Sequence, residues 1–144
     1  MYHVQQVGFG YVLTLEGVVN APEMKGWFEA TYSHLRKARG PFGVLVEARR
    51  CRPLPKLARF WLLRGQSVCE EAGLERAAVL VDSAAQEGYW PGLTRAVPSE
   101  RRVRFVDAAD HYPRVRALSW ILKGVEPNVN EDLAASGDGV AGPV

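Results

Sequence analysis

The chain has 144 residues, of which 47% are hydrophobic and 24% charged, and its net charge is +2. This composition is typical of one globular domain that is stable without a metal ion or a disulfide bond. The first residues show no cationic segment followed by an apolar run, and the apolar stretches are shorter than a bilayer span. We therefore expect neither a signal peptide nor a transmembrane helix, and place the protein in the cytoplasm.

The charges are unevenly distributed along the chain. Residues 49–64 carry six basic side chains and no acid, whereas residues 126–144 carry four acids and no base. A basic segment of this kind attracts anions, and the acidic end of the chain would compete for the same surface. A solvated helix face and a solubilising tail would have the same composition, so both interpretations stay open.

The first third of the chain predicts a β-hairpin followed by a helix. Residues 3–7 and 11–17 have the pattern of short strands, joined by a glycine-containing turn. Asn20 is a suitable N-cap for the helix, and Gly40 is expected to end it. The predicted inward face consists of Met24, Trp27, Phe28, Thr31, Leu35 and Ala38.

The middle of the chain predicts two buried strands on either side of a helix. Residues 43–48 form a short apolar run, and residues 77–81 form another. Between them, an amphipathic helix is expected to start near Pro55 and to end at Gly73. Its predicted inward face consists of Leu57, Ala58, Trp61, Leu62, Gly65, Val68, Cys69 and Ala72.

The last third predicts a short helix, a strand and a final helix. Ser83 and Gln86 have the spacing of a capping box at the start of the short helix. Residues 103–106 predict the last strand, and Asp110 is expected to cap the final helix, which Gly124 ends. The predicted inward face of that helix consists of Val115, Leu118, Ser119 and Leu122.

Strands that alternate with helices in this way predict an α/β fold. We expect a four- to five-stranded, mostly parallel sheet with an antiparallel N-terminal edge strand, covered by about four helices. The domain is placed at residues 1–124. Residues 125–144 are polar, lack any apolar period and are interrupted by glycine and proline, so we expect them to form a disordered acidic tail.

Five short runs follow one another in an order that resembles a known family. They are G-x-V-x-x-P-E-x-x-x-W-F at residues 17–28, VLVEAR at 44–49, ARFWLL at 58–63, ERAAVLVD at 75–82 and RVRFVD at 102–107. With these runs, residues 11–122 resemble the SpoIIAA-like members of the STAS superfamily. The resemblance implies a regulatory domain that binds protein partners or small hydrophobic or anionic ligands, without catalysis and without a cofactor.

The sequence departs from the best-known relatives at one position. In anti-anti-sigma factors a serine or threonine that can be phosphorylated follows the third strand, whereas residues 47–55 here contain no hydroxyl group. We therefore do not expect a phosphorylation switch in this loop. Other relatives, named STAS/Sec14-like, suggest lipid binding. Phe60 and Leu63 beside Arg59 and Arg64 would suit an amphiphile with an anionic head, although packing against a partner would need the same residues.

The histidines and cysteines do not predict a metal site. His3, His34 and His111 lie far apart, and none has a second ligand at helical spacing. Cys51 lies between Arg50 and Arg52. These cations should lower the pKa of its thiol and make it the most reactive side chain of the protein.

Acidic residues follow three of the predicted strands. Glu47, Asp82 and Asp107 would gather at the carboxyl edge of a parallel sheet, where ligands commonly bind. The same residues would also serve as caps of turns and helices, and both interpretations stay open.

The predicted interaction surface is the basic segment together with nearby aromatic and aliphatic side chains. A nucleic-acid-binding accessory protein that uses residues 49–64 is the alternative, ranked lower because the pI of about 8.7 is modest for such a protein. A homodimer is compatible with either function. The predicted ligand- or partner-binding residues are Arg49, Arg50, Arg52, Lys56, Arg59, Phe60, Leu63, Tyr89 and Trp90.

Overall fold

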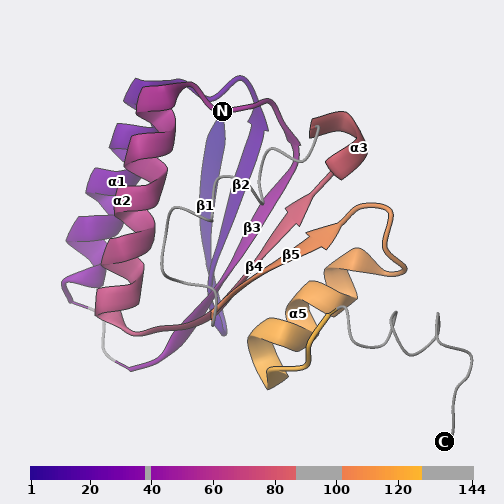
Figure 1. Ribbon diagram of the computed structural model, residues 1–144. Helices are drawn as coiled ribbons and strands as arrows, with labels where there is room; N and C mark the ends of the chain where they lie inside the picture. Colours follow the sequence, from indigo (N-terminus) through magenta and orange to yellow (C-terminus); the bar gives the residue numbers. More distant parts are fainter. Residues whose placement is uncertain (38–39, 87–101, 128–144) are drawn as a thin grey trace, which may run out of the picture.

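The computed structural model describes residues 1–37, 40–86 and 102–127. The described elements follow one another as two strands and then alternating helices and strands (Figure 1). They are β1 (Tyr2–Val7), β2 (Gly10–Gly17), α1 (Ala21–Leu35), β3 (Phe42–Cys51), α2 (Lys56–Ala72), β4 (Leu74–Val81), α3 (Ser83–Gln86), β5 (Val103–Asp107) and α5 (Pro113–Lys123).

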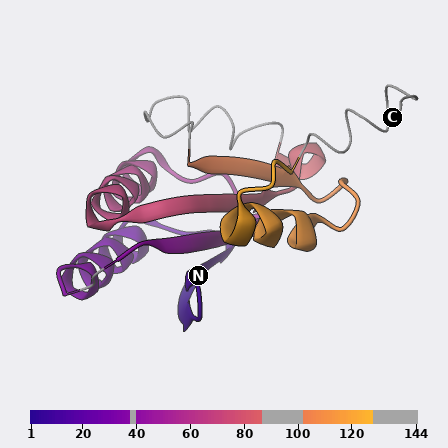
Figure 2. The same cartoon turned by 90° about the horizontal axis from the view of Figure 1, so that it is seen from below.

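The five strands form one sheet in the order β1-β2-β3-β4-β5. Strand β1 is antiparallel to β2 and the other neighbours are parallel, which confirms the predicted α/β fold with an antiparallel edge strand. Helices α1 and α2 cover one face and α5 covers the other (Figures 1 and 2). The order of the strands follows the chain and never reverses, and the helices of the β2–β3 and β3–β4 connections, α1 and α2, lie on the same face.

Alternate residues of the central strands face opposite layers. On β3, Leu45 packs with residues of α5, whereas Val46 packs under the helix pair. On β4, Ala78 and Leu80 face α5, and Val79 faces the helix pair. Because both faces of these strands are covered, their sequences are apolar almost throughout.

Gly10 is required by the approach of two strands as well as by the hairpin turn. Its φ is +150°, and a Cβ atom on it would lie 2.1 Å from the backbone oxygen of Gly43. A side chain on Gly43 would in turn meet the side chain of Ile121. The start of the β2–β3 ladder therefore needs glycine on both strands.

Helix α1 begins as predicted and ends earlier. The Asn20 side-chain oxygen accepts a hydrogen bond from the backbone N–H of Glu23 at 2.9 Å. The last helical residue is Leu35, so the predicted end at Gly40 was wrong. Leu35 is the last residue of the helix that packs into the core, and the predicted inward position Ala38 lies outside the described residues.

Strand β3 continues three residues beyond its predicted end at Ala48. Glu16 and Gly17 of β2 pair with Arg50 and Cys51. The extension is possible because backbone pairing does not depend on side-chain polarity. The first part of the basic segment is therefore strand rather than loop.

The rotation of α5 differs from the prediction. Val115 and Leu122 are 61% and 55% exposed, so placing them in the core was wrong. The indole N–H of Trp120 donates to the backbone oxygen of Ala77 at 3.0 Å, and this bond orients the helix. The buried face consists of Ala117, Trp120 and Ile121.

One inward position of α2 was also wrong. Leu57 lies in the first turn of the helix and is 58% exposed, whereas its neighbour Ala58 is fully buried. The two residues point in directions about 100° apart, so only one of them can face the core. The helix ends at Gly73 as predicted, with a left-handed φ of +115°.

Two predicted helix caps were displaced. The carboxylate of Asp82, rather than Ser83, accepts a hydrogen bond from a backbone N–H in the first turn of α3. At the start of α5 the N-cap is Tyr112, in a left-handed conformation. The carboxylate of Asp110 instead accepts from the N–H of Asp107, because it closes the turn that follows β5.

The folded domain extends beyond the predicted limit at residue 124. The Glu126 carboxylate accepts two hydrogen bonds from Arg104, at 2.7 and 2.8 Å. The backbone oxygen of Pro127 accepts a hydrogen bond from Arg116 at 2.6 Å. Both residues therefore belong to the domain, and the predicted disordered tail falls largely on residues that the structure does not describe.

Candidate functional site

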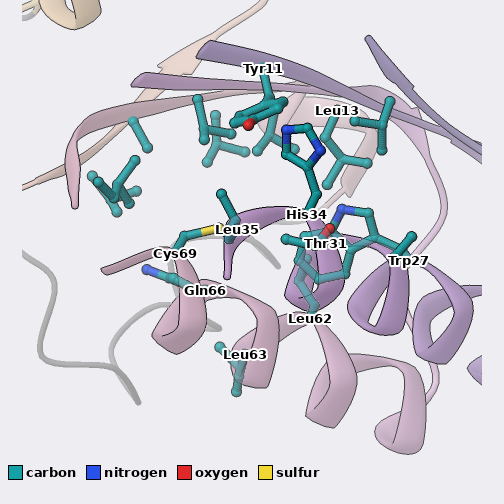
Figure 3. A pocket seen from close by; sticks show the side chains of 18 of the residues that line it. Tyr11, Leu13, Trp27, Thr31, His34, Leu35, Leu62, Leu63, Gln66 and Cys69 are labelled. Atoms are coloured by element: carbon teal, nitrogen blue, oxygen red, sulfur yellow. The ribbon is translucent and has the colours of Figure 1, made fainter. Parts of the chain in front are cut away.

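A cavity of about 370 Å³ lies between the helix pair and the sheet (Figure 3). Its volume falls within the range of roughly 300–1,000 Å³ that small-molecule sites occupy. The lining comes from α1, α2 and all five strands: Val4, Gln6, Tyr11, Leu13, Trp27, Ala30, Thr31, His34, Leu35, Val44, Val46, Leu62, Leu63, Gln66, Cys69, Leu74, Ala77, Val79 and Val103.

The close packing of α1 against α2 determines the shape of one wall. A Cβ atom on Gly65 of α2 would lie 2.2 Å from the Cη2 and Cζ3 atoms of Trp27, so the six-membered ring of the indole rests directly on the α2 backbone. Thr31 and Leu35 follow Trp27 at steps of four residues and lie on the same side of α1. This side of α1 therefore forms one wall of the cavity.

The lining residues that the structure describes are apolar with a few polar groups, and none of them is Asp, Glu, Lys or Arg. The rings of Tyr11 and His34 face each other edge-on, with centroids 5.5 Å apart. Burial, and to a lesser extent Cys69, raises the pKa of Tyr11, so its hydroxyl stays protonated at neutral pH. The cavity therefore has the character of an apolar site with uncharged hydrogen-bonding groups.

Both cysteines are buried, and burial disfavours their thiolate forms. Burial raises the pKa of Cys51 to about 11 and that of Cys69, in the cavity wall, to about 12. The expectation that Arg50 and Arg52 would lower the pKa of Cys51 was wrong. The Cys51 side chain is 3% exposed, and the cost of burying a thiolate outweighs the attraction of two cations that point to solvent.

The basic part of the predicted site lies at the other end of the sheet from the cavity. The cavity is lined by residues near the amino ends of the parallel strands, such as Leu74 and Val103, whereas Arg49 and Arg50 lie near the end of β3. The Arg49 guanidinium donates to the Glu47 carboxylate at 2.9 Å. Burial would raise the pKa of Glu47, but its hydrogen bonds and ion pair with Arg49 outweigh this effect and lower it.

The remaining predicted basic residues are available to solvent. Arg50, Arg52 and Lys56 are exposed, and Arg59 is half-buried. Within residues 1–37, 40–86 and 102–127, none of these four has an ion-pair partner. They form a cationic surface that is separate from the cavity.

Of the predicted apolar contacts, Phe60 and Leu63 lie within the described residues, and they have different surroundings. Leu63 lines the cavity. Phe60 is 48% exposed and lies on the outside of α2, with its ring 5.1 Å from that of Trp61 and below the guanidinium of Arg64. Tyr89 and Trp90 lie outside the described residues.

The acidic residues at the strand ends act mainly as caps. Asp82 caps α3, and Asp107 accepts hydrogen bonds from the backbone N–H groups of Ala109 and Ser83. A second hollow of about 430 Å³ at this edge is lined by three carboxylates and two guanidinium groups, and Glu47 and Arg49 bond to each other there. These charges largely compensate each other, so a ligand in the hollow would compete with ion pairs that are already formed. The apolar cavity is therefore the better candidate for a binding site.

The described part of the chain has neither a cluster of metal-binding side chains nor a helix that could span a membrane. Across residues 1–37, 40–86 and 102–127 there is no group of three or more His, Cys, Asp or Glu side chains placed to hold a metal ion. In the same ranges no helix combines the length and the apolar character needed to cross a bilayer.

Comparison of the chain with protein-family models, with curated proteins and with solved structures gives no match.

Several cavity residues have the burial that the sequence suggests but line a cavity that it does not indicate. Trp27 and Leu35 are buried, as their place on the inward face predicts, and His34 is exposed. The signal that could have indicated a cavity is Thr31, a polar residue on the predicted inward face between two large apolar ones. A polar side chain in that position needs either a partner or a cavity.

Proposed function

We propose that this protein is a non-catalytic binding domain that holds a small apolar molecule between the helix pair and the sheet. The observation that carries the proposal is the cavity of about 370 Å³ with an uncharged, mostly apolar lining. Apolar surface that faces water in a cavity raises the free energy of the protein. A ligand that covers this surface removes it from water, and the free energy recovered contributes to binding.

Binding without turnover is favoured by the chemistry of the lining. None of the described lining residues carries a carboxylate, and the pKa of the Cys69 thiol among them is raised to about 12 by burial. His34 therefore has no acidic partner in the cavity wall that could orient it as a general base. A binding role of this kind is in keeping with the resemblance to SpoIIAA-like members of the STAS superfamily.

A cationic surface supports a second candidate function, the binding of an anionic partner. Arg50, Arg52 and Lys56 are exposed and have no ion-pair partner within the described ranges. The partner would be an acidic protein surface, an anionic lipid or, as the alternative, a nucleic acid. A steep loss of affinity with salt would indicate a nucleic acid.

The test of the proposed function compares cavity variants with a surface variant. Naphthalene binding is measured by isothermal titration calorimetry on the wild type, on Ala77→Leu and on Val103→Phe. Both substitutions place a larger side chain in the cavity lining, so affinity should fall at least about tenfold, which corresponds to roughly 1.4 kcal/mol. Thermal unfolding followed by circular dichroism shows whether each variant is folded.

The matched control is the double variant Arg50→Glu, Arg52→Glu, which changes the cationic surface and leaves the cavity intact. It should bind naphthalene as the wild type does. Absence of naphthalene binding to the wild type, together with no small molecule retained in native mass spectrometry of protein from its own cells, would refute the cavity proposal. Loss of binding to anionic vesicles or oligonucleotides in the double variant would support the second candidate.

A further inference from the structure

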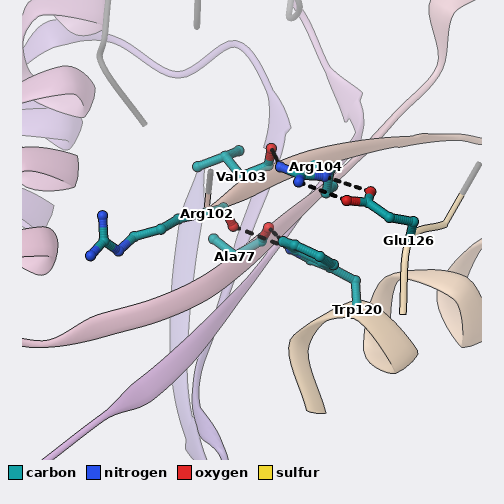
Figure 4. Close-up of polar contacts among 6 residues, drawn as sticks. All are labelled: Ala77, Arg102, Val103, Arg104, Trp120 and Glu126. Carbon is teal, nitrogen blue, oxygen red and sulfur yellow. Dashed lines mark hydrogen bonds and ion pairs between the residues drawn. The ribbon is translucent and has the colours of Figure 1, made fainter. Parts of the chain in front are cut away.

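Two tryptophans are equally buried but differ in the hydrogen bonds of their indole N–H groups. Trp27 and Trp120 are each 6% exposed. The Trp120 N–H donates to the backbone oxygens of Ala77 at 3.0 Å and Arg102 at 3.2 Å (Figure 4). The Trp27 N–H has no acceptor among the residues that the structure describes. In the described ranges, the fully buried polar atoms that lack a hydrogen-bond partner are on Glu23 and Glu70, so the Trp27 nitrogen, although its residue is largely buried, is accessible from the cavity.

The packing of Trp27 leaves the nitrogen side of its ring facing the cavity. Gly65 of α2 contacts the Cη2 and Cζ3 atoms, which belong to the six-membered ring. The Nε1 atom belongs to the five-membered ring, away from this contact. Figure 3 shows the Trp27 ring beside Thr31 and His34 in the wall of the cavity. An acceptor atom of a bound molecule can therefore approach the N–H.

Further donors lie close to Trp27. Thr31 and His34 follow on the same side of α1, and Tyr11 packs edge-on against His34 from β2. Within the described ranges, the hydroxyl groups of Thr31 and Tyr11 also have no hydrogen-bond partner. Trp27 can only donate, and the other groups can donate or accept, so together they select a ligand that accepts hydrogen bonds.

The absence of charge in the lining selects against an ionic ligand. Among the described residues no Lys or Arg side chain lines the cavity, and Arg49 and Arg50 lie at the other end of the sheet. The exposed Arg102 lies nearer, and its guanidinium donates a hydrogen bond to the backbone oxygen of Leu74. Moving a carboxylate into such a site without a paired cation would cost much more than one hydrogen bond returns. The cavity therefore favours a neutral acceptor over an anion.

We propose that the ligand is a neutral, largely apolar molecule with a carbonyl-type oxygen that accepts the hydrogen bond of the Trp27 N–H. This inference rests on the proposed function, and it names the chemical class of the ligand. It also separates the ligand from the anionic compounds that the basic segment suggested, because that segment contributes Leu62 and Leu63 to the described lining but none of its basic side chains.

The experiment uses three probes of nearly equal size: 2-acetylnaphthalene, 2-isopropenylnaphthalene and 2-naphthoate. The first two differ mainly in the exchange of an oxygen for a methylene group. Calorimetry should give a preference of about five- to tenfold for the ketone over the alkene, the worth of one neutral hydrogen bond. The naphthoate should bind more weakly than the ketone.

A spectroscopic readout identifies the donor directly. In ¹⁵N–¹H correlation spectra, the ketone should shift the indole proton of Trp27 downfield, whereas the alkene should not. The indole resonance of Trp120 is the internal control, because its N–H is already bonded twice. Trp27→Phe and Trp120→Phe variants assign the two signals.

Two conservative variants test the assignment to Trp27. Tyr11→Phe and Thr31→Val each remove one hydroxyl group from the lining with little change of volume, and the ketone should keep its preference in both. Loss of the preference in either variant would move the donor to that hydroxyl and overturn the assignment. Equal binding of ketone and alkene without a shift of Trp27, or tightest binding of the naphthoate, would overturn the proposed ligand class. These outcomes do not contradict the proposal that the cavity binds a small apolar molecule. Among the outcomes of this experiment, that proposal is contradicted only if none of the three probes binds.

Discussion

At the scale of single residues, Gly65 shows how one missing side chain shapes the candidate site. The Trp27 ring occupies the place that a Cβ atom on Gly65 would take, at 2.2 Å from two ring carbons. The sequence assigned Gly65 to the inward face of a helix but gave no reason for a glycine there. The reason is a contact between two helices that are distant in sequence, and neither helix alone indicates it.

We expect Gly65→Ala to destabilise the protein. The better helix propensity of alanine favours the variant by about 1 kcal/mol, but the clash with the Trp27 ring costs about 1–3 kcal/mol. The free energy of unfolding, measured by urea denaturation, should therefore fall or at best stay unchanged. Naphthalene binding should fall as well, because the displaced ring closes part of the cavity.

Gly26 in α1 is the matched control for this substitution. A Cβ atom on it would meet nothing closer than the Tyr2 hydroxyl at 3.6 Å, an ordinary contact. Gly26→Ala should therefore stabilise the protein by about 0.5–1 kcal/mol. If both substitutions stabilised the protein equally, the proposed packing of Trp27 on α2 would be incorrect.

At the scale of elements, Gln86 links the short helix α3 to the end of β3. Its side-chain amide donates to the backbone oxygens of Ala48 at 2.7 Å and Cys51 at 2.8 Å, and its oxygen accepts from the N–H of Asp82 at 2.9 Å. Gln86 is 6% exposed. The sequence predicted this residue as part of a capping box, and the structure shows that it mainly joins two neighbouring strand ends.

We expect Gln86→Met to lower the free energy of unfolding by about 2–3 kcal/mol. Methionine has a similar length but leaves buried backbone groups without their partners. Urea denaturation measures the loss, and hydrogen exchange should show faster opening at the end of β3. A change below about 0.5 kcal/mol would mean that water replaces the amide at these carbonyl groups.

At the scale of the whole molecule, the segment after α5 is attached to the sheet by an ion pair. The Arg104 guanidinium donates two hydrogen bonds to Glu126 and lies 4.1 Å above the Trp120 ring (Figure 4). The hydrogen bonds from Arg104 lower the pKa of Glu126. A carboxylate whose pKa is lowered on folding stabilises the protein above its unfolded pKa, and this stability is lost as pH falls through the folded pKa.

We therefore expect Glu126→Gln to reduce the pH dependence of stability in acid. At pH 7 the variant should be less stable by no more than about 1 kcal/mol, because the Glu126 side chain is 43% exposed and water screens the pair. The difference from the wild type should disappear below the folded pKa of Glu126. Thermal unfolding between pH 3 and pH 7 measures both effects, and a constant difference over this range would contradict them.

Much of the fold was predictable from local patterns. The cap at Asn20, the end of α2 at Gly73 and the apolar run of β4 depend on neighbouring residues, and each was predicted correctly. The end of α1, the length of β3 and the rotation of α5 were not, because they depend on contacts with other elements. Trp120 illustrates this dependence, since its partner Ala77 is 43 residues away.

The predicted site and the cavity are different parts of the molecule. Of the predicted site residues that the structure describes, Leu63 alone lines the cavity, and the arginines form a separate surface. Charge and exposure can be estimated from sequence, and for this reason the basic segment was predicted to be the interaction surface. A cavity is a volume left between elements, and no local pattern measures it.

The sequence by itself determined the order of the elements, the apolar character of the central strands and the excess of charge in residues 49–64, because these properties depend on side-chain chemistry and short-range periodicity. Only the tertiary structure decided that Trp27 rests on Gly65, that it lines a cavity between the helix pair and the sheet, and that Arg49 and Arg50 lie at the other end of the sheet. These features arise when distant segments pack, and the space that remains between them has no counterpart in the linear chain.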